Sequence, residues 1–305
     1  MEKLTLGIDV GNGFTKYDGN KSFASRVTLG QLSKASEKMK GINEIEYDGD
    51  TYITGTGNEF ITNNRHLKDD YLICILAAIA IKTKDIKDIE ATICIGVPIE
   101  TLQNTEYIQK IRDKYNNGQT YKYKFNGLEK NVTLKKCMIF TESAAPFIYD
   151  DYTDQIVIDV GAGTISVAHW NKMKIVGTEF HTYNEGMYVV CNKILKELKN
   201  KSNEDVSVEY VQKNLGNDTI KLNNTEIDFR FHKKILARHI TSIVSKINTD
   251  FKTNEVKKIR LIGGGASITY DYWKDDLGDN VLLEKEPQFV NSKVYQKYAE
   301  LVSKK

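Results

Sequence analysis

The feature of this sequence that most constrains its fold is an internal repeat. Residues 8–15 read IDVGNGFT, and residues 158–165 read IDVGAGTI, about half the chain later. Each copy follows a short apolar run and precedes a second strand-forming run, so each copy predicts a strand, a tight turn and a returning strand. A unit that recurs at half the length of a chain of 305 residues indicates two similar domains.

The rest of each half alternates between helical and strand patterns. Apolar residues have helical spacing at residues 71–82, 105–115, 186–199 and 231–251, and strand patterns occur at residues 91–97, 121–125, 130–135, 137–141 and 258–262. Asn126-Gly127, between two of these strands, predicts a hairpin. We interpret residues 37–63 and 200–228 as peripheral insertions. Strands mixed with helices predict an α/β fold.

Composition excludes several classes of function. The chain has 43 basic and 41 acidic residues, a formal charge of +2, and no polybasic arm. It therefore gives no support for direct binding to nucleic acid or to a membrane surface. Residues 1–7 lack the pattern of a signal peptide, and the apolar stretch 71–81 is too short to span a bilayer. We expect a cytoplasmic protein.

Metal-binding and nucleophilic motifs are absent from the cysteine and histidine pattern. The four cysteines stand alone in apolar segments, which predicts small core residues, and the five histidines are scattered. These residues are Cys74, Cys94, Cys137, Cys191, His66, His169, His181, His232 and His239.

The repeated turn has the chemistry of a phosphate-binding loop. In each copy an aspartate, Asp9 or Asp159, precedes a turn with two glycines, whose missing side chains let backbone N–H groups approach an anion. The turn residues are Gly11, Asn12 and Gly13 in the first copy and Gly161, Ala162, Gly163 and Thr164 in the second. One such turn is commonly an ordinary β-turn, whereas two at matching positions predict hairpins that hold a polyphosphate between the domains.

The leading aspartates imply a metal ion. A carboxylate beside a phosphate repels it unless a cation intervenes, so Asp9 and Asp159 imply Mg²⁺, held through water molecules. Lys16, on the returning strand, is placed to reach a phosphate as a point charge.

A third glycine cluster ends the strand predicted at residues 258–262. Gly263, Gly264 and Gly265 would let the backbone approach a flat base or a phosphate, and a plain turn is the alternative.

Glu142 lies in the segment FTESAAP, residues 140–146, between the two halves. A carboxylate there, at the end of a predicted strand, could orient or deprotonate a water molecule that attacks a terminal phosphate. The alternative is a carboxylate at the N-terminus of a helix, stabilised by the helix dipole. Both interpretations remain open from local sequence.

Together these motifs resemble the actin-like superfamily, which includes actins, chaperone ATPases and sugar kinases. The resemblance implies an α/β fold with duplicated ribonuclease H-like domains around a nucleotide cleft. It implies domain I at residues 1–148 plus 286–305 and domain II at residues 149–285. Residues 9–16 resemble the first phosphate motif, 142–146 the first connecting helix, 159–164 the second phosphate motif, 262–267 the adenosine motif and 291–298 the second connecting helix. Gly186 resembles a glycine near the nucleotide in relatives.

Within that superfamily the chain is most similar to plasmid-segregating actins of the ParM and Alp type, through its size and the segment IGVPI at residues 95–99. The resemblance implies that ATP, or alternatively GTP, is hydrolysed with Mg²⁺, and that Asp9, Asp159 and Glu142 form the catalytic set. It also implies a homopolymer filament that disassembles after hydrolysis and an adaptor protein that binds a plasmid centromere-like site. Ala162, where actin has a second carboxylate, departs from actin's metal shell.

The competing interpretation is a small-molecule kinase of the same fold, of the sugar-kinase type. Such an enzyme would place a carboxylate base against a substrate hydroxyl. Activator ATPases with an iron–sulfur cluster need paired cysteines, and the isolated cysteines argue against that class.

Overall fold

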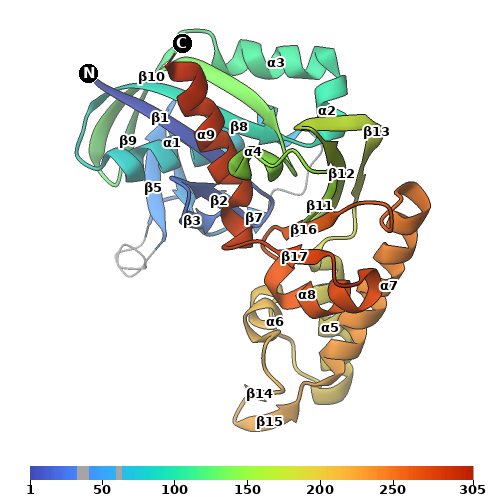
Figure 1. The fold of residues 1–305 in the computed structure, drawn as a ribbon. Coiled ribbons are helices and arrows are strands. Elements are labelled where there is room, and N and C mark those ends of the chain that lie inside the picture. Colours follow the sequence, from blue (N-terminus) through green and yellow to red (C-terminus); the bar gives the residue numbers. More distant parts are fainter. Residues whose placement is uncertain (33–40, 60–63, 305) are drawn as a thin grey trace. The chain divides into compact units, whose positions relative to one another are not determined.

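The computed structural model describes residues 1–32, 41–59 and 64–304, which divide into two compact units (Figure 1). Unit 1 comprises Met1–Ile148 and Phe289–Lys305, and unit 2 comprises Tyr149–Gln288. The sequence predicted that the chain returns from domain II to domain I between residues 285 and 286, slightly before the end of unit 2. Residues 286–288 group with unit 2, where the Gly263 amide donates to the Pro287 carbonyl at 2.8 Å.

Unit 1 is built on one mixed sheet whose strand order is β3-β2-β1-β8-β10-β9-β5-β6-β4-β7. Its strands are β1 (Glu2–Val10), β2 (Phe14–Tyr17), β3 (Lys21–Ala24), β4 (Arg26–Leu29), β5 (Asn43–Tyr47), β6 (Asp50–Thr54), β7 (Asn58–Glu59), β8 (Asp88–Val97), β9 (Thr120–Phe125) and β10 (Leu128–Thr141). Its helices are η2 (Arg65–Leu67), α1 (Asp69–Thr83), α2 (Ile99–Gln103), α3 (Thr105–Tyr115), α4 (Pro146–Tyr149, which crosses into unit 2), η3 (Pro287–Phe289, which returns) and α9 (Val290–Ser303).

One prediction for this sheet was wrong. Residues 130–135 and 137–141 form the single strand β10, in which a register shift between Leu134 and Lys136 interrupts the alternation of side chains. The described part of the segment predicted as a peripheral insertion, residues 37–63, adds β5, β6 and β7 toward one end of the sheet, where β5 pairs with β9. Residues 33–40 and 60–63 lie outside the described residues. Asn126 and Gly127 both have positive φ in the β9–β10 turn, which confirms the predicted hairpin.

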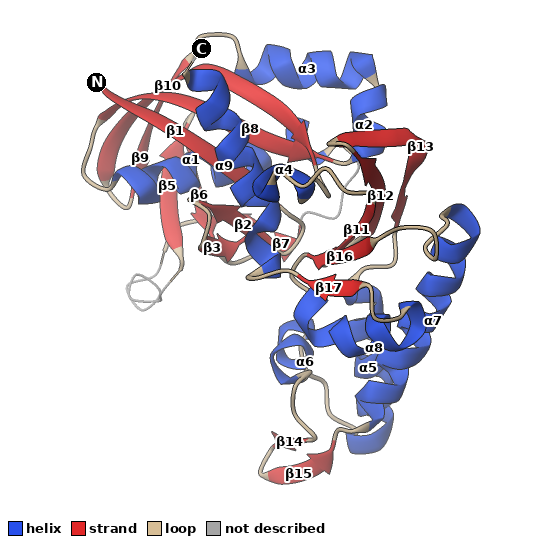
Figure 2. Cartoon of the chain, in the orientation of Figure 1, coloured by secondary structure: helices blue, strands red, loops and turns tan. Residues whose placement is uncertain are grey.

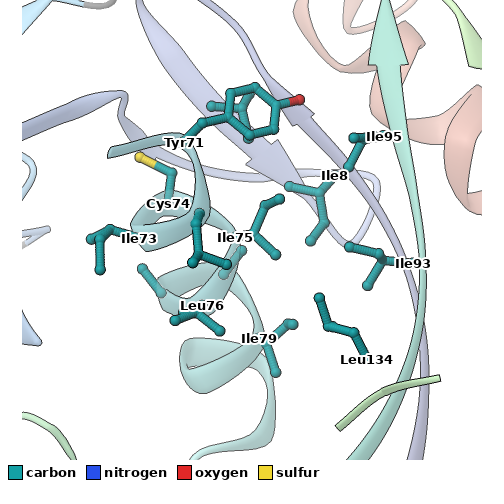
Figure 3. Close-up of a cluster of buried hydrophobic side chains, with 14 of the residues drawn as sticks. Ile8, Tyr71, Ile73, Cys74, Ile75, Leu76, Ile79, Ile93, Ile95 and Leu134 are labelled. Carbon is teal, nitrogen blue, oxygen red and sulfur yellow. The ribbon is translucent and has the colours of Figure 1, made fainter. Parts of the chain in front are cut away.

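Helices α1 and α9 cover opposite faces of β1, as alternation along the strand requires. Ile8 packs with the fully buried α1 residues Ile75 and Ile79 (Figure 3). On the other face a Cβ at Gly7 would lie 2.1 Å from the Gln296 amide nitrogen, so α9 needs a glycine there. The Gln296 side chain accepts a 2.7 Å hydrogen bond from the Gly7 amide. Helix α9, which contains the segment that resembles the second connecting helix, therefore packs on β1, the strand that leads into the first hairpin.

Unit 2 contains a second sheet together with helices (Figure 2), and this sheet repeats the central topology of the unit 1 sheet. Its sheet has the order β13-β12-β11-β16-β17, which matches β3-β2-β1-β8-β10 in both order and strand direction. The elements are β11 (Gln155–Val160), β12 (Ile165–Asn171), β13 (Lys174–Tyr183), α5 (Met187–Ser202), α6 (Val208–Asn214), β14 (Thr219–Leu222), β15 (Thr225–Asp228), α7 (Phe231–Asp250), β16 (Lys258–Ile262), α8 (Ala266–Leu277) and β17 (Val281–Leu283). The duplication inferred from the repeat is thus present in the fold.

The four cysteines are buried, as predicted for small core residues, and no helix among the described residues is long and apolar enough to cross a bilayer.

A cluster of charged side chains around Arg260 links the beginning and the end of unit 2. The Arg260 guanidinium donates to Asp151 at 2.5 Å and also to Glu284, and it lies over the Tyr149 ring. Because Tyr149 and Asp151 begin the unit and Glu284 lies near its end, the cluster fastens both ends of unit 2 to β16. Burial opposes ionisation of Asp151, but hydrogen bonds from Lys258, Thr153 and Arg260 outweigh burial and hold its pKa well below its usual range.

We expect Asp151→Asn to lower the free energy of unfolding of unit 2 by roughly 3 kcal/mol near neutral pH, because it removes the carboxylate that Lys258 and the buried Arg260 share and leaves Arg260 with Glu284 alone. The pKa of Asp151 is lower in the folded state, so this stabilisation is complete above the usual value of 3.8 and is lost as the pH falls below it. Both tryptophans, Trp170 and Trp273, lie in unit 2, so their fluorescence during denaturant unfolding reports on that unit. Asp275→Asn, at an exposed position of α8, is the control. If Asp151→Asn lowered the free energy of unfolding by the same amount well below pH 3.8 as at neutral pH, the stabilising role of the ionised Asp151 would be contradicted.

Candidate phosphate-binding hairpins and their surroundings

The first hairpin joins β1 to β2 in unit 1. The Gly11 amide donates to the Phe14 carbonyl at 3.1 Å, and Val10 pairs with Thr15. Asp9 is 5% exposed and forms a 2.9 Å ion pair with Lys16, its partner in the strand register. Lys16, which we predict to contact a phosphate, therefore lies beside Asp9, which we predict to face the metal ion.

The second hairpin has the same geometry in unit 2. The Gly161 amide donates to the Thr164 carbonyl at 2.9 Å, and Val160 pairs with Ile165. Asp159 is 9% exposed and pairs in register with Ser166, so this hairpin has a hydroxyl where the first has Lys16.

The N-terminus of α5 lies against the second hairpin. The amides of Gly186, Met187 and Tyr188 donate to the carbonyls of Gly163, Gly161 and Ala162, at 3.1, 3.1 and 2.8 Å. A Cβ at Gly186 would lie 2.5 Å from the Gly163 carbonyl carbon, so only glycine permits this approach. The structure therefore places Gly186 directly beside the second hairpin.

The glycine cluster after β16 completes the surroundings of the second hairpin. Gly263 has φ +92°, and a Cβ there would lie 2.3 Å from Asp159 Oδ1. The Gly265 amide donates to the Val160 carbonyl at 2.9 Å. Nothing lies within 4 Å of a Cβ at Gly264. Unit 2 thus brings together Asp159, its hairpin, Gly186 and the three glycines.

Glu142 directly follows β10 in unit 1. Its amide donates to the Val97 carbonyl at 2.9 Å, and the residue is 8% exposed. The short helix α4 begins only at Pro146, so Glu142 does not lie in the first turn of a helix. The helix-dipole interpretation of this carboxylate is therefore wrong.

Arg65 is a site residue that sequence reasoning missed. Its Nη1 donates to Asn12 Oδ1 at 2.6 Å, and its Nη2 donates to Glu142 Oε1 at 2.9 Å. Burial opposes the charge of this guanidinium, but Glu142 outweighs burial and raises the pKa of Arg65. No local motif marks Arg65, because its ion-pair partner is 77 positions away in the sequence.

His66 anchors the segment that carries Arg65. The imidazole contacts the Gly96 carbonyl through Nε2 at 3.2 Å and the Tyr107 hydroxyl through Nδ1 at 3.1 Å. Burial, together with the neighbouring Arg65 charge, lowers the pKa of His66 to about 3, so the ring is neutral and donates to Gly96. The Tyr115 hydroxyl donates to the His66 carbonyl at 2.7 Å. These bonds fix η2 to β8 and α3.

A cavity of about 450 Å³ elsewhere in unit 1 is not part of this arrangement. It is lined by residues of β5, β6, β9 and β10, including Tyr47, Lys122 and Asn131, and by none of the predicted site residues.

The two units thus define a duplicated α/β protein with one glycine hairpin and one buried aspartate in each unit. Two family models match it: "Actin like proteins N terminal domain" at residues 7–144 and "Archaeal actin homologue MreB-like, C-terminal" at residues 157–274. The chain belongs to the actin-like proteins. A comparison with curated proteins found no match.

Solved structures share the fold at low sequence identity. The archaeal actin homologue Ta0583 in complex with ADP has 18% identity and a TM-score of 0.82, over 98% of this chain and 99% of that one. A ParM from a 15-stranded filament of Clostridium botulinum has 18% identity and a TM-score of 0.78, over 99% and 100%. Bacillus thuringiensis ParM with ATP has 15% identity and a TM-score of 0.73, over 100% of both chains. The predicted actin-like fold is confirmed.

We expect Gly263→Ala to destabilise unit 2 by at least about 2 kcal/mol, because it adds a side chain at positive φ and directly against Asp159. Gly264→Ala, at the neighbouring position with open space, should change the free energy of unfolding by less than about 1 kcal/mol. Denaturant unfolding followed by tryptophan fluorescence measures both. Equal effects of the two variants would show that Gly263 does not pack against the aspartate as described.

Proposed function

We propose that this actin-like chain binds and hydrolyses ATP, assembles with copies of itself into filaments, and drives plasmid DNA segregation through an adaptor protein. The observation that carries the proposal is the identical register of the two hairpins, each of which follows a buried aspartate. Structures of similar fold that contain ADP, contain ATP or form a 15-stranded filament support it.

Backbone amides and Lys16 bind the phosphates in this proposal. The hairpins of residues 11–13 and 161–164 offer N–H groups on a glycine backbone that an anion can approach closely. Lys16 supplies a positive charge beside the first hairpin, at 14% side-chain exposure. Gly186 and residues 263–265 lie beside the second hairpin, and Gly264, where a Cβ would meet nothing within 4 Å, is where the nucleoside part of the ligand can approach the backbone.

The carboxylates suit Mg²⁺ bound mainly through water. Asp9 and Asp159 offer oxygen ligands, which Mg²⁺ prefers, and no group of three or more potential metal ligands occurs among the described residues. One or two carboxylates with phosphate oxygens and water molecules is the usual magnesium arrangement in nucleotide sites. When bound, Mg²⁺ would neutralise phosphate charge, and Asp9 and Asp159 would hold it from the protein side.

Glu142 is the residue that we assign to the attacking water. Its carboxylate is nearly buried, and its charge is compensated by Arg65. An ionised, fixed carboxylate can accept a hydrogen bond from a water molecule and orient it toward the terminal phosphate.

Self-association and the adaptor follow from family membership and charge. A filament needs a head-to-tail interface that does not close on itself. The charge balance of +2 gives no support for direct DNA binding, which is why we assign DNA contact to an adaptor. We place the protein in the cytoplasm and favour ATP, with GTP as the alternative.

Light scattering and phosphate release test this proposal directly. With Mg-ATP, right-angle light scattering should rise above a critical protein concentration, and phosphate release should follow the rise. Scattering that stays flat, together with sugar-dependent formation of ADP, would replace the proposal with a small-molecule kinase. The same two measurements with Mg-GTP show whether the protein prefers ATP or GTP.

We expect Glu142→Gln to slow phosphate release by about 100-fold and to lengthen filament lifetime, because an amide orients water poorly but still accepts a hydrogen bond from Arg65. ATP affinity should not fall, since the substitution removes no group that binds the nucleotide. Glu106→Gln, on the exposed α3 surface, is the matched control. Phosphate release at the wild-type rate in Glu142→Gln would remove Glu142 from this role.

A further inference from the structure

Arg65 lies where the first hairpin and Glu142 meet in unit 1. One nitrogen of its guanidinium bonds Asn12, the middle residue of the hairpin turn, and another bonds Glu142. The side chain is 12% exposed. A single planar cation therefore touches both the predicted phosphate loop and the predicted water-orienting carboxylate.

The position of Arg65 is fixed by its neighbours rather than by a loose surface conformation. His66 bonds Gly96 and Tyr107, and the Leu67 carbonyl accepts a 2.8 Å hydrogen bond from Lys114. The backbone on the carboxyl side of Arg65 is thus tied to β8 and α3. A preorganised guanidinium loses little freedom when it binds a ligand.

Asn12 is a weak partner for this cation. A neutral amide oxygen attracts a guanidinium less than a phosphate does, and the guanidinium fork matches two phosphate oxygens. A phosphate bound to the amides around Asn12 would lie within a few ångströms of Arg65, because the present bond to Asn12 is only 2.6 Å long. Such a phosphate would compete for Arg65 with both Asn12 and Glu142.

Tyr71, whose ring packs against the residue that follows Arg65, is a second feature of this region. The Tyr71 hydroxyl is fully buried and has no hydrogen-bond partner among the described residues. It lies within electrostatic reach of Arg65 and Asp9, and its ring packs against His66 with centroids 4.9 Å apart. An unsatisfied buried hydroxyl is costly, and an oxygen of water or phosphate at this place would satisfy it.

From this geometry we infer that Arg65 recognises the terminal phosphate of the bound nucleoside triphosphate and exchanges partners as it does so. Without that phosphate, Arg65 holds Glu142. With the phosphate bound, Arg65 pairs with its oxygens and releases the Glu142 carboxylate to accept a hydrogen bond from water. The inference rests on the proposed nucleotide site and adds the residue that distinguishes the triphosphate from the diphosphate.

The test compares the affinities of ATP and ADP, both measured with Mg²⁺ by displacement of a fluorescent nucleotide analogue from the full chain. Wild-type protein should bind ATP about tenfold or more tightly than ADP, as expected for a charge-assisted bond to the extra phosphate. Arg65→Gln should bring this ratio close to 1 while ADP affinity changes by less than about threefold. Arg65→Lys keeps the positive charge but loses the planar guanidinium that can bind two phosphate oxygens, so its ratio of ATP to ADP affinity should lie between those of the wild type and Arg65→Gln.

Arg112→Gln, on the exposed surface of α3, is the control and should keep the wild-type ratio. If Arg65→Gln does not fold, Arg65→Lys alone decides, because a residue with a merely structural role would weaken ATP and ADP binding equally. An unchanged ratio in the folded variants, or equal affinities in the wild type, would overturn the inference about Arg65. Failure of wild-type protein to bind either nucleotide would instead overturn the proposed function.

Discussion

A single backbone hydrogen bond sets the geometry of each hairpin: the first glycine amide donates to the carbonyl three positions later. This bond fixes the register of the two strands, and the register places the aspartate and the turn amides at the same end of the sheet. Both leading strands, β1 and β11, also pair with a parallel strand on their other side, so neither can slide without losing two ladders. The chemistry available at each turn is therefore a consequence of strand pairing.

The two units keep this backbone and differ in what they place around it. In unit 1 charged side chains surround the hairpin, namely Lys16, Arg65 and Glu142. In unit 2 glycines and the first amides of α5 occupy the corresponding surroundings. Fixed charges stabilise the charge of a phosphate in the transition state, whereas glycines let a ligand approach the backbone closely. For this reason the proposed function assigns charged side chains to unit 1 and close approach to a glycine backbone to unit 2.

Much of the architecture could be predicted from the sequence, because it depends on short-range patterns. The helix at residues 105–115 and the strand at residues 258–262 have the predicted bounds. The differences from the prediction have physical causes. The irregularity at Lys135 made one strand look like two, and β5 pairs with a partner far along the chain, which its own short pattern does not reveal. Within the site, repeated glycines marked the hairpins, but Arg65 is defined by distant contacts and carries no local signal.

Arg260 and Arg65 show how the same residue type can serve different roles. Arg260 is enclosed by Asp151, Glu284 and Gln155 and lies over a tyrosine ring, so its charge is fully compensated by groups that belong to unit 2. Arg65 instead divides its bonds between one carboxylate and one neutral amide at the turn where an anion is expected. A buried ion pair is weak evidence for stability, because desolvation of the charges opposes their attraction. The hydrogen bond from Arg65 to a neutral amide of the hairpin is therefore better explained by an anionic ligand that replaces the amide than by stability, whereas the two carboxylates around Arg260 are sufficient reason for its burial.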